Sequence, residues 1–139
     1  KTASEQLDIR LPHGNIWILA QEKILIRILC NLIDNALKYS TGDIMFYMWG
    51  ESEYCHIQIS NPSDYISDEE LKSRFVLPKD EARIKSSGIG LYATRKLVIQ
   101  ISGDIQVNYE AGIFTVSIKL PLYEKIGHSR KIKDIVTAF

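Results

Sequence analysis

Two asparagines four residues apart, Asn31 and Asn35, are followed by Lys38 and Tyr39 in the stretch NLIDNALKYS. On a helix with about 100° per residue, the two amides and the lysine fall within an arc of roughly 60°, beside the apolar face. Amide oxygens suit Mg²⁺, a lysine suits phosphate oxygens, and a tyrosine ring offers an aromatic surface for a base. The alternative, for the two asparagines considered alone, is that they cap loops or form hydrogen bonds with the neighbouring backbone. The stripe predicts a nucleotide-phosphate site.

A second candidate phosphate site is the stretch SSGIGLYATRKL, in which Gly88 and Gly90 stand immediately before a predicted helix. Unshielded backbone N–H groups at a helix N-terminus can receive a phosphate, although a turn that needs positive φ explains the same glycines. Lys79, Arg83 and Lys85 lie in the charged loop before them. These three cations either reach a phosphate or belong to a solvated loop.

The helix that carries the first motif is predicted over residues 21–39, where apolar residues recur at spacings of three and four. They are Ile24, Leu25, Ile28, Leu29, Leu32, Ile33, Ala36 and Leu37. A short helix is predicted with Ser67 as its N-cap and Glu70 completing a capping box. A third helix, over residues 91–102, is closed by Gly103.

Runs of β-favouring residues predict strands over 5–11 and 14–20, on either side of a turn. A hairpin is predicted to join 43–49 to 54–60 through the four-residue turn GESE, and another to join 104–110 to 112–122 around Ala111 and Gly112. Hairpins with two long helices inserted predict an α+β fold. We expect a two-layer α/β sandwich whose mixed, mainly antiparallel sheet has helices on one face.

The composition indicates one ordinary domain, because 139 residues with 45% hydrophobic and 24% charged residues can form a real core. Basic and acidic residues both total 17, so no global basic field favours nucleic acid or an anionic membrane. No apolar run approaches the ~20 residues that span a bilayer, so we expect a soluble piece. Cys30 and Cys55 lack metal-ligand spacing and are predicted to be small buried hydrophobes in a reducing compartment.

The motifs occur in an order that resembles the catalytic, ATP-binding domain of sensor histidine kinases, within the GHKL superfamily of ATPases. NLIDNALKYS matches the N box of that family, SRF stands at its F box, and SSGIGLYATRKLV matches its second glycine box. The resemblance covers about residues 5–122 and implies a Bergerat-type sandwich. We therefore expect a kinase-like domain over 1–122 and a tail over 123–139 that is a linker or an added helix.

The resemblance implies a role for each matching residue. Asn31 would lie beside the ATP phosphates, Asn35 would ligate Mg²⁺, Lys38 would contact phosphate and Tyr39 would flank the nucleotide. Phe75 would anchor the lid, which is the charged loop before the second glycine box. The lid and the second glycine box would add nucleotide contacts from Lys79, Arg83, Lys85, Ser87, Gly88, Ile89, Gly90 and Leu91.

The chain departs from the family pattern after the central strand, where the family carries an Asp followed by Gly-x-Gly and this chain reads ISNPSDYIS. Asn61 falls at the Asp position, and its amide oxygen can accept from the adenine amino group. Asp64 is a second candidate for that role. Both expected glycines are absent, with Pro62, Ser63 and Tyr65 in their segment.

The resemblance implies a cytoplasmic kinase domain that binds Mg²⁺–ATP and transfers the γ-phosphoryl group to a histidine. The hydrolytic relatives place a glutamate at the position of Asn31, and an amide cannot act as a general base. His13, His56 and His128 do not lie in a Glu-rich helical hairpin, so the acceptor is expected on a preceding dimerisation domain. A response regulator or receiver domain is the expected partner. A nucleotide-independent pseudokinase that acts as an interaction module and an anti-sigma-factor-type serine kinase remain alternatives.

Overall fold

The computed structural model describes residues 7–10, 17–18, 22–51, 53–74, 90–121 and 130–131. Within these ranges the main sheet has five strands in the order β1–β3–β4–β6–β5. They are β1 (Leu7–Arg10), β3 (Ile44–Glu51), β4 (Tyr54–Pro62), β5 (Asp104–Glu110) and β6 (Ile113–Pro121). Strand β1 runs parallel to β3, and the other neighbouring pairs are antiparallel.

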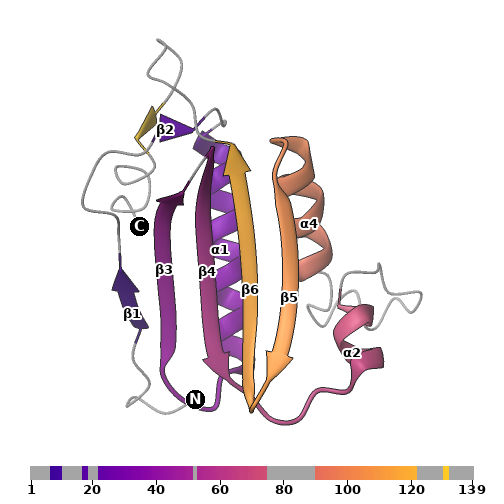
Figure 1. The fold of residues 1–139 in the computed structure, drawn as a ribbon. Coiled ribbons are helices and arrows are strands. Elements are labelled where there is room, and N and C mark those ends of the chain that lie inside the picture. Colours follow the sequence, from indigo (N-terminus) through magenta and orange to yellow (C-terminus); the bar gives the residue numbers. More distant parts are fainter. Residues whose placement is uncertain are drawn as a thin grey trace.

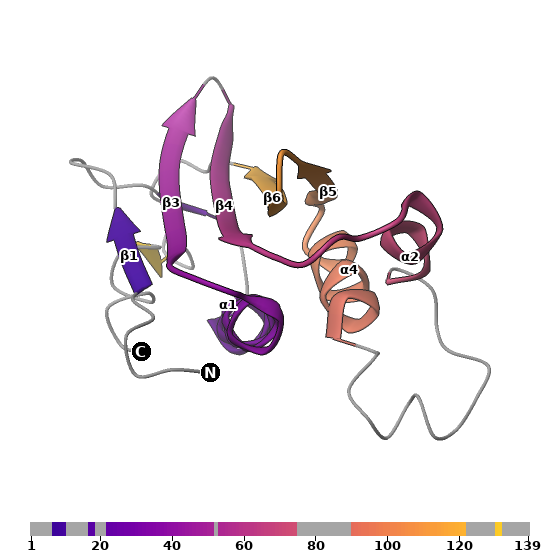
Figure 2. The ribbon, with the colours of Figure 1, turned by 90° about the horizontal axis from the view of Figure 1, so that it is seen from below.

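Two helices cover one face of this sheet, α1 (Glu22–Tyr39) and α4 (Gly90–Gln100). They lie side by side on the same face of the sheet, as Figures 1 and 2 show from two directions. The short helix α2 (Asp68–Ser73) lies beyond α4, near β5. This arrangement confirms the predicted α+β fold, a two-layer sandwich with a mixed, mainly antiparallel sheet and helices on one face.

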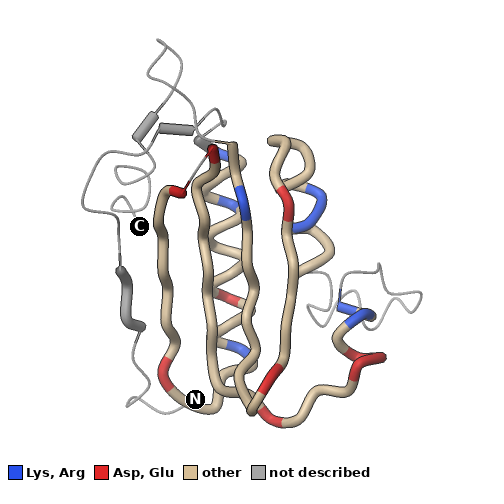
Figure 3. Tube along the Cα trace, in the orientation of Figure 1, with Lys and Arg blue, Asp and Glu red and all other residues tan. Residues whose placement is uncertain are grey.

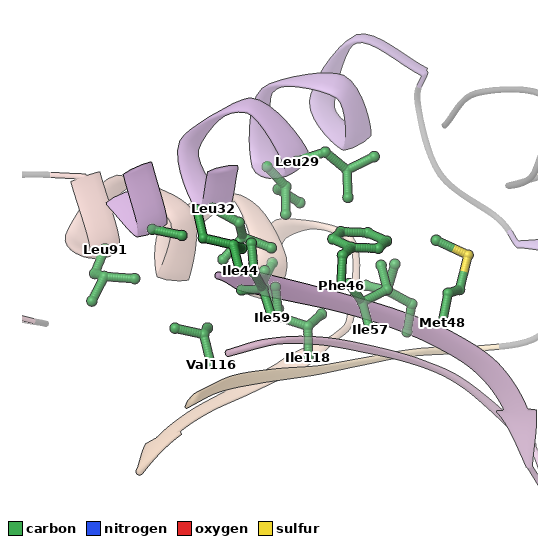
Figure 4. Packing of buried hydrophobic residues seen from close by; sticks show 14 of the residues in the cluster. Leu29, Leu32, Ile44, Phe46, Met48, Ile57, Ile59, Leu91, Val116 and Ile118 are labelled. Carbon is green, nitrogen blue, oxygen red and sulfur yellow. The ribbon is translucent and has the colours of Figure 1, made fainter. Parts of the chain in front are cut away.

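The hydrophobic core lies between the sheet and the two helices, where Figure 4 shows side chains of both layers meeting. Strand residues point alternately to the two faces, so Ile44, Phe46 and Met48 of β3 are buried while their neighbours are not. The predicted apolar face of α1 is buried or partly buried as expected, except for Leu37, which is 43% exposed. At about 100° per residue, Leu37 lies well away from the middle of the buried face.

Both predicted hairpins of the main sheet are present. In the first, Gly50 pairs with Cys55 and Glu51 with Tyr54, so the connection is shorter than the predicted turn GESE. The ladder continues into Gly50 and Glu51, which are disfavoured in strands, because pairing with the neighbouring strand overrides local propensity. In the second, Ala111 and Gly112 form the turn with φ of 53° and 79°. Two successive positive φ values match the twist of the flanking strands, which is why this short connection works.

The helix caps are partly as the sequence predicts. Ser67 is the N-cap of α2, and its Oγ accepts a hydrogen bond from the Glu70 amide at 3.1 Å. At the end of α4, Ser102 rather than Gly103 has the left-handed φ, at 64°. The Gly103 amide donates to the Val98 carbonyl at 2.8 Å, which is the six-residue bond of a Schellman motif. Gly103 is therefore required for a different reason, the close approach of neighbouring atoms.

A separate two-stranded ladder joins distant parts of the chain. Strand β2 (Trp17–Ile18) pairs antiparallel with β7 (Arg130–Lys131) rather than with β1. Arg130 and Lys131, in the segment predicted as a linker or an added helix, thus form a strand. The weak amphipathic pattern of the tail does not predict pairing with a strand so far away in sequence. The predicted turn over 12–14 lies outside the described residues, and the domain boundary after residue 122 stays a prediction.

Candidate functional site

The polar stripe of the N box lies along α1 as predicted. Asn31 and Asn35 are half-buried at the flank of the helix, and Lys38, one turn later, is exposed. Asp34, between the two asparagines, points to solvent. Side chains three and four residues apart on a helix are neighbours, so the amides and the ammonium group present one continuous polar strip.

The end of α1 is tied to the end of β4 by backbone hydrogen bonds. The Ser40 amide continues the helix ladder to the Ala36 carbonyl at 2.8 Å, and the Thr41 amide donates to the Pro62 carbonyl at 2.9 Å. Gly42 fits against Pro62 so closely that a Cβ on it would lie 2.9 Å from the proline Cγ. This joint fixes the chain at the end of α1, two residues after Tyr39, against the end of β4, one residue after Asn61.

Asn61 is a buried polar side chain at this joint, only 2% exposed. Its Nδ2 donates to the Pro62 carbonyl at 3.0 Å. That bond assigns the orientation of the amide and makes Oδ1 the atom that can accept from another molecule. Asp64, the second candidate for the same role, is exposed. Asn61 therefore has the geometry of an acceptor held in place, and Asp64 does not.

Replacing Asn61 by aspartate is expected to lower the free energy of unfolding by about 2 kcal/mol at neutral pH. The carboxylate has the size of the amide but no N–H to donate, so it faces the Pro62 carbonyl as a second acceptor. Burial raises the pKa of such a carboxyl, so the folded state keeps the proton to higher pH than the unfolded state. Stability then falls as pH rises, and urea denaturation at about pH 5 and about pH 8 measures the difference.

Asn108, exposed on β5, offers the matched control for that substitution. Asn108→Asp is expected to change the unfolding free energy by less than about 0.5 kcal/mol at either pH. Equal losses for the two variants, or a loss at Asn61 that does not depend on pH, would contradict the interpretation of the buried amide.

The segment after Asn61, where the family pattern has glycines, is held against the β5–β6 hairpin. The Ser63 amide donates to the Gly112 carbonyl at 3.0 Å, and the Tyr109 hydroxyl donates to the Ser63 carbonyl at 3.4 Å. Tyr65 is 80% exposed, with its ring edge-on to that of Tyr109 at 6.2 Å between centroids. The bulky Tyr65 side chain is thus directed to solvent rather than toward the joint.

Arg74 is a further residue of this region, and sequence reasoning missed it. Its guanidinium Cζ lies 4.4 Å from the ring centroid of Tyr39 and 5.0 Å from that of Phe114. Phe114 is in turn the cross-strand partner of Asn61. The only signal in the sequence was its position in SRF, at the end of a capped helix. One face of Tyr39 is therefore in contact with an arginine, which limits the aromatic surface that this ring offers to a base.

The structure brings only part of the predicted site together. Gly90 is the first residue of α4, and Leu91 is 3% exposed within the hydrophobic core. The other predicted contacts lie outside the described residues: Phe75, Lys79, Arg83, Lys85, Ser87, Gly88 and Ile89. Their roles stay predictions.

The cysteine and histidine side chains in the described part of the chain have structural environments. Burial raises the pKa of the Cys55 thiol to about 12, so this side chain is a protonated core residue, and Cys30 is half-buried. His56 stacks on Trp49, with centroids 5.0 Å apart. Within the described ranges, no three His, Cys, Asp or Glu side chains are grouped to hold a metal ion. Charged residues of both signs are spread over helices and strands (Figure 3).

No helix in the described part of the chain has the length and apolar character needed to cross a membrane.

Comparison with known proteins identifies relatives of this chain. Residues 20–124 match the family described as histidine kinase-, DNA gyrase B- and HSP90-like ATPases. The chain is 31% identical over 116 residues to the sensor protein DltS of Streptococcus agalactiae, covering 79% of this chain and 29% of DltS. It is 30% identical over 129 residues to the histidine protein kinase DivJ of Caulobacter vibrioides, covering 87% of this chain and 21% of DivJ. The chain thus spans less than a third of either relative.

Solved structures show the same fold. A mycobacterial sensor histidine kinase, MprB, superposes with a TM-score of 0.70 at 19% identity, covering 88% of this chain and 85% of that one. Full-length ShkA in complex with AMPPNP superposes with a TM-score of 0.68 at 18% identity, covering 88% of this chain and 27% of that one. With the family match over most of its length, the chain belongs to the histidine kinase-, DNA gyrase B- and HSP90-like ATPases and is a histidine kinase-type ATPase domain.

Proposed function

We propose that this chain is the ATP-binding catalytic domain of a two-component sensor histidine kinase. In this proposal it binds Mg²⁺–ATP and donates the γ-phosphoryl group to a histidine on a separate dimerisation and phosphoacceptor domain. The observation that carries the proposal is the joint between α1 and β4, which ties the end of the helix that bears the polar strip to the end of the strand that bears the buried amide of Asn61.

The side chains of the polar strip and of Asn61 are of types that can bind a nucleotide. The Oδ1 of Asn61 suits the exocyclic amino group of adenine, because the Nδ2 of the same amide is already engaged by Pro62. Lys38 supplies positive charge for phosphate oxygens. Asn35 would supply a neutral amide oxygen of the kind that Mg²⁺ accepts as a ligand, and Asn31 would lie beside the phosphates.

In the proposed reaction, the bound Mg²⁺–ATP supplies the phosphoryl group, and the residues of this chain position it. Asn35 would hold the metal, and Lys38 would neutralise negative charge on the phosphates. Asn31 lies beside the phosphates but cannot take a proton from water, so the site favours transfer over hydrolysis. Further contacts are proposed for the residues predicted in the lid and the second glycine box, from Lys79 to Leu91.

The names of the relatives support a proposal about partners. DltS is named a sensor protein and DivJ a histidine protein kinase, and ShkA was solved with AMPPNP, an analogue of ATP. We propose that a dimerisation and phosphoacceptor domain precedes this chain, that a response regulator or receiver domain takes the phosphoryl group onward, and that the domain works in the cytoplasm.

One observation favours a second candidate, a nucleotide-independent interaction module. Pro62, Ser63 and Tyr65 stand where the family pattern has glycines, and Ser63 is bonded to the Gly112 carbonyl. A segment fixed in this way has less freedom to adapt to a ligand than a glycine loop has. In that case the fold would be retained for docking a protein.

Calorimetric titration of the purified domain with ATP and Mg²⁺ tests the proposal. We expect saturable binding accompanied by a rise in melting temperature. An absence of heat and of thermal stabilisation at about millimolar ATP would reject it and favour the interaction module.

Phosphotransfer is tested next by adding a cognate histidine phosphoacceptor domain and labelled ATP. The label is expected on that domain as an acid-labile phosphate, and none on His13, His56 or His128 of the isolated chain. Acid-stable phosphate on a protein substrate would instead identify a serine kinase.

A further inference from the structure

Arg74 has an environment that its own protein contacts do not explain. Its side chain is only 12% exposed, and its guanidinium lies close to the rings of Tyr39 and Phe114. Among the described residues its one ion pair, from Nη2 to the Glu70 Oε1 at 3.6 Å, is long and involves a carboxylate whose side chain is 54% exposed. The Nη1 atom is fully buried and has no hydrogen-bond partner among the described residues.

A buried N–H of a charged group without an acceptor is unfavourable, and surface ion pairs of this length offset little of that cost. A variant with an apolar side chain of similar length against the two rings is expected to have the same free energy of unfolding as the wild type or a higher one. The two ring contacts favour the charge, but among the described residues the Nη1 donor is left without an acceptor, so they account for only part of the environment of this arginine. An acceptor that arrives with a ligand does account for it.

The position of Arg74 indicates what that acceptor is. The ring of Tyr39 contacts two cations, the Lys38 Nζ at 5.1 Å from its centroid and the Arg74 Cζ at 4.4 Å. Two positive charges around one ring repel each other, and an anion near both relieves the repulsion. A guanidinium with aromatic rings against it binds through its edge, and its fork of N–H donors matches phosphate oxygens.

We propose that Arg74 is a phosphate-binding residue of this domain, which contacts the polyphosphate of the nucleotide from α2 while Lys38 contacts it from α1. The inference rests on the proposed function in that the phosphate belongs to ATP. Arg74 would then join the site from a third element, next to the β6 strand that pairs with Asn61.

Three variants test the proposal in the full chain. Arg74→Met fills the space between the rings without charge, Arg74→Lys keeps the charge without the planar fork, and Lys72→Met removes an exposed cation from the same helix as the matched control. Each is titrated with Mg²⁺–ATP by calorimetry and with adenosine by chemical-shift changes, and its melting temperature is measured without nucleotide.

We expect Arg74→Met to weaken ATP binding by about tenfold or more, with adenosine binding within about twofold of wild type. Its melting temperature without nucleotide is expected to be unchanged or higher. Arg74→Lys is expected to keep part of the ATP affinity, and Lys72→Met to keep all of it.

A wild-type ATP affinity in Arg74→Met would overturn the inference and leave the proposed function standing. Equal losses for ATP and adenosine, together with a lower melting temperature, would show that Arg74 only holds Tyr39 in place. A wild-type chain that binds no ATP would reject both the proposed function and this inference.

Discussion

Replacing Asn35 by alanine is expected to lower the affinity for Mg²⁺–ATP by roughly 10- to 100-fold. The amide oxygen proposed to bind the metal is lost, and the carboxylate of the neighbouring Asp34 is exposed to solvent. Because the contact acts through Mg²⁺, binding of ATP in the presence of a chelator is expected to change much less. Parallel calorimetric titrations with Mg²⁺ and with chelator measure both quantities.

Asp34→Ala is the matched control, because it removes an exposed side chain one position away on the same helix. We expect wild-type ATP affinity in this variant and wild-type melting temperatures in both. If Asn35→Ala lowered the affinity for ATP equally with and without Mg²⁺, the metal-ligand assignment would be wrong. If it left both affinities unchanged, Asn35 would have no role in nucleotide binding in this chain.

Replacing Gly103 by alanine is expected to lower the free energy of unfolding by about 3 kcal/mol. A Cβ at this position would lie 2.6 Å from the Lys119 carbonyl oxygen, 2.8 Å from a methyl of Leu120 and 2.9 Å from a methyl of Val98. The oxygen belongs to the backbone of a paired strand, so it cannot move without breaking the β5–β6 ladder. The midpoint of urea denaturation measures the loss.

Gly112→Ala separates the effect of crowding from that of backbone conformation. Gly112 has a φ of 79°, but a Cβ there would meet nothing within 4 Å. Only the left-handed conformation is then strained, at about 1 kcal/mol. A loss at Gly103 no larger than the loss at Gly112 would show that the strand end relaxes to accept the methyl group.

Elements with local signals were predictable from the sequence. The helix over 21–39, the two hairpins and the Ser67 cap depend on periodicity and turn chemistry within a short window, and each is present close to its predicted bounds. The pairing of β1 with β3 and of β2 with β7 depends on residues far apart in sequence. Propensity says that such segments can be strands but not which strand each will meet.

The candidate site follows the same division. Asn31, Asn35 and Lys38 were proposed because helix periodicity places them on one strip, Tyr39 because it follows Lys38, and Asn61 because of its spacing after a predicted strand. Arg74 was missed because its environment is formed by residues of three elements, and no spacing along the chain predicts those contacts. At the end of α4, the glycine in the sequence correctly predicts where the helix ends. It does not reveal that Ser102 has the left-handed conformation and that Gly103 makes the close contacts.

The pairing of β4 with β6 also sets the order in which the molecule can assemble. The hairpins β3–β4 and β5–β6 join strands that are close in sequence, whereas β4 and β6 are partners from Tyr54↔Pro121 to Pro62↔Ile113. Closing a loop of more than about 50 residues is entropically costly, so we expect the local hairpins to form early and to dock late. The contact of Arg74 with Phe114 and the pairing of Asn61 with Phe114 both cross that late junction. A refolding chain is therefore expected to recover its hairpins before it recovers the ability to bind a nucleotide.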